Sequence, residues 1–486
     1  MSKAIRELEP KALWNNFANL NAVPRGSKKE EKVIQFMVDF GNKLGLETII
    51  DPIQNVIIKK PATQGMEDRK TVVLQSHLDM VWQKNNDTDF DFETEGIKMY
   101  IDGDWVTADG TTLGADNGLG VAAIMSILES KDIQHPAIEA LFTIDEETGM
   151  TGAQGLQAGY LDGEILLNLD TEDDDEIDMG CAGGIDVTAT GNYKEENILD
   201  NTVTMCLGVK GLNGGHSGMD IHKGLGNANK ITNRVLYETF DFDINIVSIN
   251  GGSLRNAIPR ESNVVLVVPK AKQGAFENKV KSITQLIKKE FATVDGNLEI
   301  SLTECKVPAT KTMDTHSQIN LIKAIYAAHN GVYRMSPDIE GLTETSNNLA
   351  KVTVENGSIK IECLTRSAVE SSKMDLAQAL RSSFELAGYQ VEFAGSYPGW
   401  QPNPKSPILG VLSDIYTNMF DKKPNVVACH AGLECGILGT NYPEMDMISF
   451  GPTIEGAHSP DERANIKSTQ KFWDYLLEIL KNIPKK

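Results

Sequence analysis

Short apolar runs alternate with helical patterns in the first part of the chain, and this alternation limits the fold more than any other feature. TVVLQS (71–76), IEALFTI (138–144) and EILLNL (164–169) are predominantly apolar, as strands covered on both faces are. NGLGVAAIMSILES (117–130) is predicted to form a helix between the first two strands. Strands that alternate with helices build parallel sheets, so we expect an α/β fold here.

The pattern changes in the middle of the chain and then returns. Strand-like runs such as SNVVLVVPK (262–270) and GSIKIECLTRS (357–367) surround helical runs such as FENKVKSITQLIKKEF (276–291), which is typical of an α+β module. A chain of 486 residues also exceeds what one hydrophobic core holds. We therefore predict two domains: an α/β catalytic domain made of residues 1–185 and 391–486, and an inserted α+β lid domain made of residues 186–390.

A further helix is predicted near the start of the chain. Ser27 and Glu30 have the spacing of a capping box, in which each side chain accepts a hydrogen bond from the other residue's backbone. Apolar residues then recur at helical spacing as far as Gly45, which is predicted to end the helix.

Composition excludes several classes of function. The net charge of −22 argues against nucleic-acid binding, because phosphates demand a basic surface. No stretch approaches the roughly 18 apolar residues that a membrane helix needs. The charged start of the chain does not resemble a secretion signal. We therefore expect a cytoplasmic protein with neither a nucleic-acid nor a membrane partner.

The six cysteines are scattered, and no two of them form a C-x-x-C pair. This spacing indicates neither a zinc ribbon nor a thioredoxin-like motif. We expect all six to be reduced thiols, mostly buried.

Two histidines and five carboxylates follow strand-like runs or begin helices. They are His77 and Asp79 after TVVLQS, Asp116 before the 117–130 helix, Glu146 and Glu147 after IEALFTI, Asp170 after EILLNL, and His458 near the end of the chain. Ligands of open α/β sheets bind outside the carboxyl ends of the strands, so one sheet edge is expected to collect these residues. Taken singly, each has an ordinary structural explanation as a loop residue, a solvated helix start or an N-cap.

The residue types suit a pair of divalent metal ions, because imidazole nitrogen and carboxylate oxygen are typical zinc ligands. Two ions need a carboxylate that bridges them, and Asp116 lies centrally in the set. Each ion then needs one histidine and one further carboxylate. His77 with Asp170, and His458 with Glu147, provide that symmetry.

Two carboxylates remain after this count. Asp79 follows His77 by two residues and could orient its imidazole through a hydrogen bond. Glu146 stands beside a predicted ligand and suits the role of general base.

Five motifs occur in the order in which the M20 peptidases carry their metal-binding residues. They are SHLDMVW, DGTTLGADNGLGVAA, IDEETGMTGA, LNLDTED and GAHSPDERA. The sequence resembles most the aminoacyl-histidine dipeptidase branch, whose members are bacterial cytosolic enzymes that cleave Xaa-His dipeptides. The resemblance covers nearly the whole chain and implies the roles assigned above by ligand counting. It also implies a cis peptide bond between Asp116 and Asn117.

The resemblance further implies a mechanism, a cofactor and an assembly. A water that bridges the two ions would attack a short peptide, with Glu146 as general base. Zinc is the expected metal, with manganese or cobalt as alternatives. A homodimer acting on dipeptides is expected.

Segments of the lid domain resemble the family less tightly. GLNGGHSGMDIHKGLGNA indicates that His216 stabilises the tetrahedral intermediate, at the partner subunit's site in a dimer or at its own site after closure. RNAIPRE indicates that Asn256 contacts substrate. Arg366 in LTRS and His430 in HAGLECG correspond to groups that grip the substrate carboxylate.

Two other functions remain open at this point. A deacylase of N-acyl amino acids from the same superfamily would carry the same metal site. A non-catalytic metal-binding or peptide-binding protein would not need Glu146 beside a complete ligand set. Motifs of zincins, P-loop proteins and nucleophile-elbow hydrolases do not occur.

Overall fold

The computed structural model describes residues 2–305 and 309–486, which form two compact units. Unit 1 comprises Met1–Cys181, Trp400–Ala428 and Leu433–Lys486, and unit 2 comprises Ala182–Gly399 and Cys429–Gly432. The domain boundaries were expected after residues 185 and 390, so both need correction. They move because β9 (Gly183–Asn192) and β21 (Gln390–Tyr397) pair with each other in the sheet of unit 2.

Unit 1 contains an eight-stranded sheet whose centre is parallel. In sheet order its strands are β1 (Glu47–Ile50), β2 (Val56–Lys60), β6 (Ile138–Thr143), β3 (Val72–His77), β7 (Ile165–Asn168), β23 (Asp446–Ser449), β8 (Glu176–Cys181) and β22 (Asn425–Cys429). Every residue of β3, β6 and β7 is buried, as their continuous apolar sequences predict. The predicted α/β fold is confirmed.

The helices of unit 1 pack on this sheet and on one another. They are α1 (Ser2–Ile5), α2 (Lys11–Leu20), α3 (Glu31–Leu44), α4 (Ala115–Glu129), α5 (Glu146–Gly149), α6 (Thr151–Gly155), α11 (Pro407–Phe420), α12 (Glu434–Asn441) and α13 (Ile466–Lys481). Helix α4 packs against β3 and α2, and nearly all of its side chains are buried. A small sheet of β24 (Ile454–Glu455), β25 (Arg463–Asn465), β5 (Trp105–Ala108) and β4 (Met99–Asp102) completes the unit.

The helix predicted near the start of the chain is α3, but its predicted capping box is wrong. Glu30 caps the helix without a side-chain hydrogen bond, and its carboxylate accepts instead from the backbone N–H of Lys28 (2.9 Å). The Ser27 hydroxyl donates to the Asp79 carboxylate at 2.7 Å, so a tertiary contact replaces the local one. Gly45 ends the helix as expected, in the left-handed conformation.

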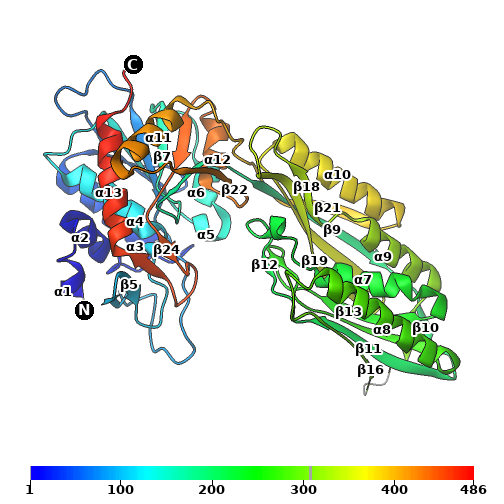
Figure 1. The fold of residues 1–486 in the computed structure, drawn as a ribbon. Coiled ribbons are helices and arrows are strands. Elements are labelled where there is room, and N and C mark those ends of the chain that lie inside the picture. Colours follow the sequence, from blue (N-terminus) through cyan, green and yellow to red (C-terminus); the bar gives the residue numbers. More distant parts are fainter. Residues whose placement is uncertain (1, 306–308) are drawn as a thin grey trace. The chain divides into compact units, whose positions relative to one another are not determined.

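Unit 2 is an antiparallel sheet with helices on one face (Figure 1). In sheet order the strands are β16 (Glu299–Glu304), β11 (Thr202–Lys210), β15 (Ser262–Pro269), β13 (Asn245–Gly251), β19 (Thr343–Glu355), β20 (Ser358–Ser367), β9 and β21, with β18 (Gly331–Met335) also paired to β19. The helices are α7 (Ala228–Glu238), α8 (Gln273–Glu290), α9 (Thr315–Ala327) and α10 (Glu370–Leu386). One apolar core lies between these layers, which is the predicted α+β arrangement.

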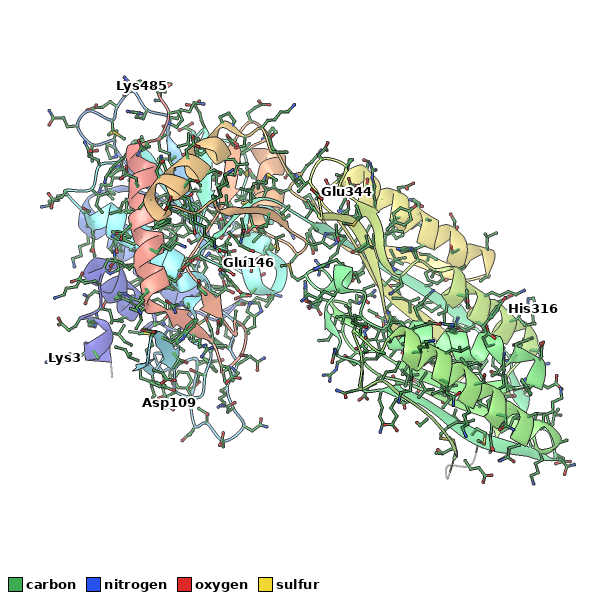
Figure 2. The ribbon with its side chains drawn as sticks, in the orientation of Figure 1. Lys3, Asp109, Glu146, His316, Glu344 and Lys485 are labelled. Carbon is green, nitrogen blue, oxygen red and sulfur yellow. A yellow bond between two sulfur atoms is a disulfide. The ribbon has the colours of Figure 1, made fainter. Side chains whose placement is uncertain are left out.

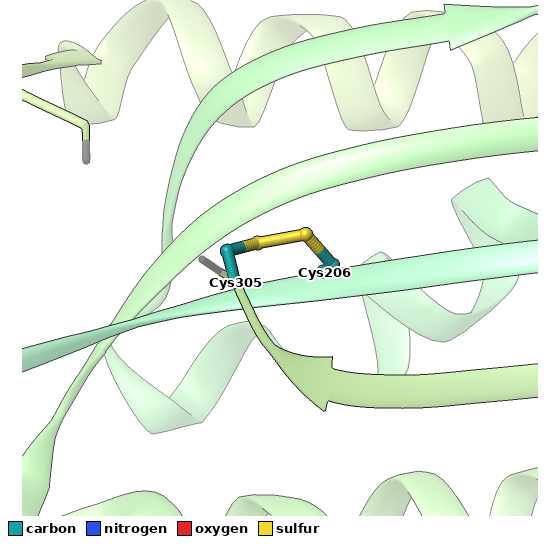
Figure 3. The surroundings of a disulfide bond; sticks show 2 residues. All are labelled: Cys206 and Cys305. Atoms are coloured by element: carbon teal, nitrogen blue, oxygen red, sulfur yellow. A yellow bond between two sulfur atoms is a disulfide. The ribbon is translucent and has the colours of Figure 1, made fainter. Parts of the chain in front are cut away.

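Cys206 and Cys305 form a disulfide, which corrects the expectation that all six cysteines are thiols (Figure 3). Cys206 lies on β11 and Cys305 directly follows β16, and these neighbouring strands bring their Cα atoms to 5.3 Å. The two cysteines are 99 residues apart in the chain, so their spacing in the sequence carries no sign of the pairing. Cys181, Cys363 and Cys435 lie outside this disulfide and are buried, and Cys429, also outside it, is partly exposed.

Across the described residues, none of the helices combines the length and the apolar composition that crossing a membrane requires.

Candidate active site

The carboxyl ends of the parallel strands in unit 1 gather the predicted site residues. His77 is the last residue of β3, Asp170 follows β7, and Glu147 lies on α5 directly after β6. Asp116 is in the first turn of α4, and His458 lies on the loop between β24 and β25. His458 has a φ of 63°, a left-handed conformation that is uncommon outside glycine.

The Asp116 carboxylate is shared between two histidines. Its Oδ1 lies 3.2 Å from His77 Nε2, and its Oδ2 lies 3.2 Å from His458 Nε2. His77 Nε2 also lies 3.4 Å from Asp170 Oδ1, and His458 Nε2 lies 2.8 Å from Glu147 Oε2. Two triads result, His77–Asp116–Asp170 and Asp116–Glu147–His458, each with donor atoms within 4.8 Å of one another.

The electrostatics of the triads favour positive charge. Hydrogen bonds that the His458 imidazole donates to Asp116 and Glu147 raise the pKa of His458 to about 11. Burial would lower the pKa of His77, but the surrounding aspartates raise it well above its ordinary value. Burial likewise opposes ionisation of Asp116, yet the two histidines hold its pKa low. Carboxylates and imidazoles arranged in this way can hold divalent cations.

Glu146, which is labelled in Figure 2, precedes Glu147 in the chain but belongs to neither triad. Burial raises the pKa of Glu146 well above its ordinary value; His77 opposes the rise, and the charges of Asp170 and Glu434 add to it. A carboxyl group with a raised pKa is suited to accept and return a proton near neutral pH.

Asp79 connects the first triad to the start of α5. Its Oδ1 lies 3.4 Å from His77 Nδ1 and accepts from the Glu146 N–H at 3.0 Å. Its Oδ2 accepts from the Glu147 N–H at 3.3 Å and from the Ser27 hydroxyl at 2.7 Å. Asp79 is fully buried, so these contacts fix both the imidazole and the two glutamates.

The peptide bond between Asp116 and Asn117 is cis, as expected. The Asn117 side chain is buried and donates a hydrogen bond to Asp170 Oδ1. Asn117 therefore links the residue shared by both triads to a member of the first triad.

Three buried residues of unit 1 support the site and were not predicted. Glu462 accepts hydrogen bonds from the backbone at the start of α4, and Arg25 donates to backbone carbonyls beside both triads. Glu434 accepts from Gln75 and Thr143, both at 2.6 Å. Glu462 stands in the same motif as His458, but nothing in the sequence indicates which backbone it contacts.

The predicted catalytic and substrate-binding residues of unit 2 form a second cluster. His216 lies on β12 (Gly215–His216), which pairs with β14 (Ala257–Ile258), and the Ser217 N–H donates to the Asn256 carbonyl at 2.8 Å. Arg366 on β20 donates to the Ser217 hydroxyl at 3.4 Å and to the Tyr397 hydroxyl at 2.8 Å. Tyr397 and Ser217 were not predicted, and they aim the guanidinium group.

His430 packs against the same loop. A Cβ added to Gly218 would lie 1.9 Å from the His430 carbonyl oxygen, so only glycine allows this approach. His430 Nε2 lies 2.8 Å from the Ser346 hydroxyl. Burial and the charge of Arg366 lower the pKa of His216 to about 4 and that of His430 to about 3. Both imidazoles are therefore neutral at pH 7.

A parallel α/β sheet with two histidine–carboxylate triads that share one aspartate at its carboxyl edge defines a dinuclear metallohydrolase. The sequence matches the peptidase family M20/M25/M40 over residues 73–482, and the chain belongs to this family. The family assignment made from the five motifs is confirmed, and the protein is a metallopeptidase.

Individual relatives agree with this assignment. The chain is 44% identical to the cytosol non-specific dipeptidase of Escherichia coli (strain K12) over 483 residues, covering 99% of each chain. The crystal structure of aminoacylhistidine dipeptidase from Vibrio alginolyticus matches with a TM-score of 0.92 and 46% identity, covering 100% of both chains. A tripeptidase from Staphylococcus aureus shares the fold, with a TM-score of 0.57, 17% identity, and coverage of 98% of this chain and 99% of the other.

Proposed function

We propose that this protein is a metal-dependent dipeptidase that hydrolyses short peptides with a free amino terminus, Xaa-His dipeptides among them. The observation that carries the proposal is the Asp116 carboxylate, whose two oxygens face the histidines of two different triads. The names of the dipeptidases that the chain resembles over its whole length support the substrate class.

The side chains of the triads fit two divalent ions. His77, Asp116 and Asp170 would hold one ion, and Asp116, Glu147 and His458 the other. Nitrogen and carboxylate oxygen donors suit zinc, which we propose as the metal, with manganese or cobalt as alternatives. When bound, such ions supply Lewis acidity, which makes a water more acidic and polarises a carbonyl.

The protein's own groups move the proton. Glu146 takes a proton from the attacking water and returns it to the departing amine, which its raised pKa permits near neutral pH. Asp79 holds the imidazole of His77 and the start of α5 in place while this happens.

His216 is proposed to donate a hydrogen bond to the oxyanion. Its Nδ1 accepts from the backbone N–H groups of Gly218 (3.3 Å) and Met219 (3.1 Å). Because a neutral imidazole carries one proton, that proton is on Nε2, which is then free to donate. The low pKa of His216 keeps the ring in this form at neutral pH.

Arg366 and His430 are proposed to bind the substrate carboxylate, and Asn256 is proposed to contact the substrate. Arg366 is 4% exposed and already directed by Tyr397 and Ser217, so it loses little freedom when it binds an anion. A cation at this position favours cleavage of a peptide bond next to a free carboxyl terminus, and the single peptide bond of a dipeptide is such a bond. We further propose a cytoplasmic homodimer.

The remaining alternative is a deacylase of N-acyl amino acids. Hydrolysis of paired free and N-acetylated dipeptides, both Xaa-His dipeptides and others, would be measured with metal-depleted protein and with metal-reconstituted protein. We expect metal-dependent hydrolysis of the free dipeptides and about two bound ions per chain. Preference for the acetylated compounds would favour the deacylase. Absence of hydrolysis after reconstitution would refute both.

A further inference from the structure

One buried carboxylate accepts hydrogen bonds from four consecutive backbone amides beside the shared aspartate. Glu462 Oε2 accepts from the N–H groups of Leu113 (2.7 Å) and Gly114 (2.9 Å). Its Oε1 accepts from Ala115 (2.7 Å) and Asp116 (3.3 Å). The first amides of a helix lack partners within the helix, and a negative charge there is also favourable. Glu462 thus caps α4 from 346 residues away, at the residue on which both triads depend.

Glu462 is itself held in place. It is 2% exposed, and its carbonyl accepts from the Thr107 hydroxyl at 2.9 Å. The strand β25, which begins at the next residue, pairs with β5. Glu462 follows His458 on the same loop, so this one segment contributes a side chain to the second triad and an anchor for Asp116.

The backbone carbonyl group of Gly114, at the start of α4, is also held by a hydrogen bond. Arg25 is fully buried; its Nη2 donates to the Gly114 carbonyl, and its Nη1 donates to the carbonyls of Leu78 (3.1 Å) and Asp79 (3.0 Å). Gly114 has a φ of 71°, and an added Cβ would lie 2.5 Å from Arg25 Nη2. A side chain at Gly114 would be strained and would clash with the buried Arg25 guanidinium group, so the orientation of Asp116 depends on the groups that hold the turn.

We propose that Glu462 is a positioning residue for metal binding: through the backbone of residues 113–116 it holds the Asp116 carboxylate where it can serve both ions. This inference rests on the proposed dinuclear function. Asp116 belongs to both triads, so loss of Glu462 would weaken the binding of both ions. Loss of a ligand that belongs to one triad would weaken mainly the binding of one ion.

Glu462→Gln tests the proposal. The amide retains the size of the side chain but turns one acceptor into a donor that faces backbone N–H groups. Metal-depleted full-length protein would be titrated with Zn²⁺ and with Mn²⁺ against a competing chromophoric chelator, and its thermal unfolding midpoint measured without metal. We expect the metal affinity of both sites in Glu462→Gln to fall about 10- to 100-fold, which is the usual effect of losing a residue that orients a metal ligand.

Two matched variants separate positioning from general destabilisation. Glu139→Gln alters another buried carboxylate of unit 1, which accepts from the N–H groups of Asp162 and Gly163 (both 2.9 Å) and pairs with Lys59 (2.7 Å). It should lower the unfolding midpoint and leave metal affinity unchanged. Asp461→Asn removes a negative charge from the exposed residue that precedes Glu462. It should change neither the unfolding midpoint nor the metal affinity.

The outcomes are distinct. Equal affinity in Glu462→Gln and the unaltered protein, or an equal loss of affinity in Glu139→Gln, would overturn the proposal. If Glu462→Gln does not fold, Glu462→Asp keeps the charge on a shorter side chain and should bind both ions more weakly than the unaltered protein; unchanged affinity in that variant would also overturn the proposal. If the unaltered protein itself fails to bind two ions, the proposed function fails instead.

Discussion

Two adjacent glutamates in unit 1 have different surroundings, although their side chains are chemically identical. Glu147 Oε2 lies 2.8 Å from His458 and is part of the second triad. Glu146 is in neither triad, and burial raises its pKa well above the ordinary value. Asp79 accepts hydrogen bonds from the backbone N–H groups of both glutamates and so fixes their backbone. The proposed ligand and the proposed base therefore differ only in the direction of their side chains.

This difference can be measured by exchanging each glutamate for glutamine. Glu147→Gln should lower metal occupancy as well as rate, because an amide is a poorer ligand than a carboxylate. Glu146→Gln should keep both ions, while its turnover falls by about 10²- to 10⁴-fold, as expected for a lost acid–base group. Metal stoichiometry and dipeptide turnover would be measured side by side. Metal loss in Glu146→Gln with retention in Glu147→Gln would reverse the assignment.

At the scale of elements, α4 approaches the sheet so closely that one position excludes any side chain. A Cβ added to Gly120 would lie 2.1 Å from Asn117 Oδ1, 2.5 Å from Ser76 Oγ and 2.8 Å from the Leu169 carbonyl oxygen. Asn117 is the residue that donates to Asp170. The packing of α4 and the geometry of the first triad are therefore coupled at this glycine.

Gly120→Ala should consequently reduce both stability and metal affinity. Overpacking of this kind typically destabilises by about 1–3 kcal/mol, and displacement of Asn117 would disturb Asp170. Gly410→Ala is the matched control, because Gly410 is exposed on α11 with no atom within 4 Å of an added Cβ. That exchange should stabilise by about 0.5–1 kcal/mol through helix propensity. Thermal unfolding and metal titration would check both, and an unperturbed Gly120→Ala would contradict the packing argument.

Elements set by local sequence were predictable, whereas contacts between distant segments were not. The runs at 71–76, 138–144 and 164–169 became β3, β6 and β7, because a short, continuous apolar run is typical of a strand that is buried on both faces. The capping box at Ser27 failed because Asp79, 52 residues away, takes the hydroxyl. The same reason hid Glu462, whose amide partners lie more than 340 residues earlier in the chain. Sequence periodicity reports burial and conformation but not the identity of a tertiary partner.

The disulfide between β11 and the end of β16 gives a further element-scale prediction. Of the six cysteines, only the four outside this disulfide should react with an alkylating reagent in the denatured, unreduced protein, and mass analysis should recover a peptide pair joined through Cys206 and Cys305. Cys206→Ser should destabilise unit 2 by about 2–4 kcal/mol, because the disulfide restricts the unfolded chain. Six reactive thiols would show that the two strands are not joined.

At the scale of the whole molecule, the two units carry complementary chemistry. Unit 1 presents the three carboxylates and two histidines of the triads, together with Glu146. Unit 2 presents Arg366 and two neutral imidazoles. On the proposed mechanism neither set suffices alone, because the first binds metal and moves the proton while the second binds the substrate carboxylate and the oxyanion. Catalysis then requires a unit 2 from either the same chain or the partner subunit.

Mixing two inactive variants would decide which chain supplies His216. His216→Ala alone should lower kcat by about 10²- to 10³-fold, as for loss of one oxyanion donor, with metal content unchanged. His222→Ala, an exposed histidine in the same loop, is the control and should retain activity. Glu146→Gln should be inactive because it lacks the proposed general base, which lies on unit 1. In a mixed dimer the His216→Ala chain keeps an intact Glu146, and the Glu146→Gln chain keeps an intact His216.

If His216 acts on the partner subunit's site, each mixed dimer has one complete site. Half of an equal, fully exchanged mixture is mixed dimer, so activity should return to about a quarter of that of the unaltered protein in a twofold-symmetric assembly. We expect this recovery, measured after refolding the variants together and verifying subunit exchange by native mass spectrometry. If exchanged dimers remain inactive, His216 serves its own chain's site. If only monomers form, the proposed homodimer is wrong.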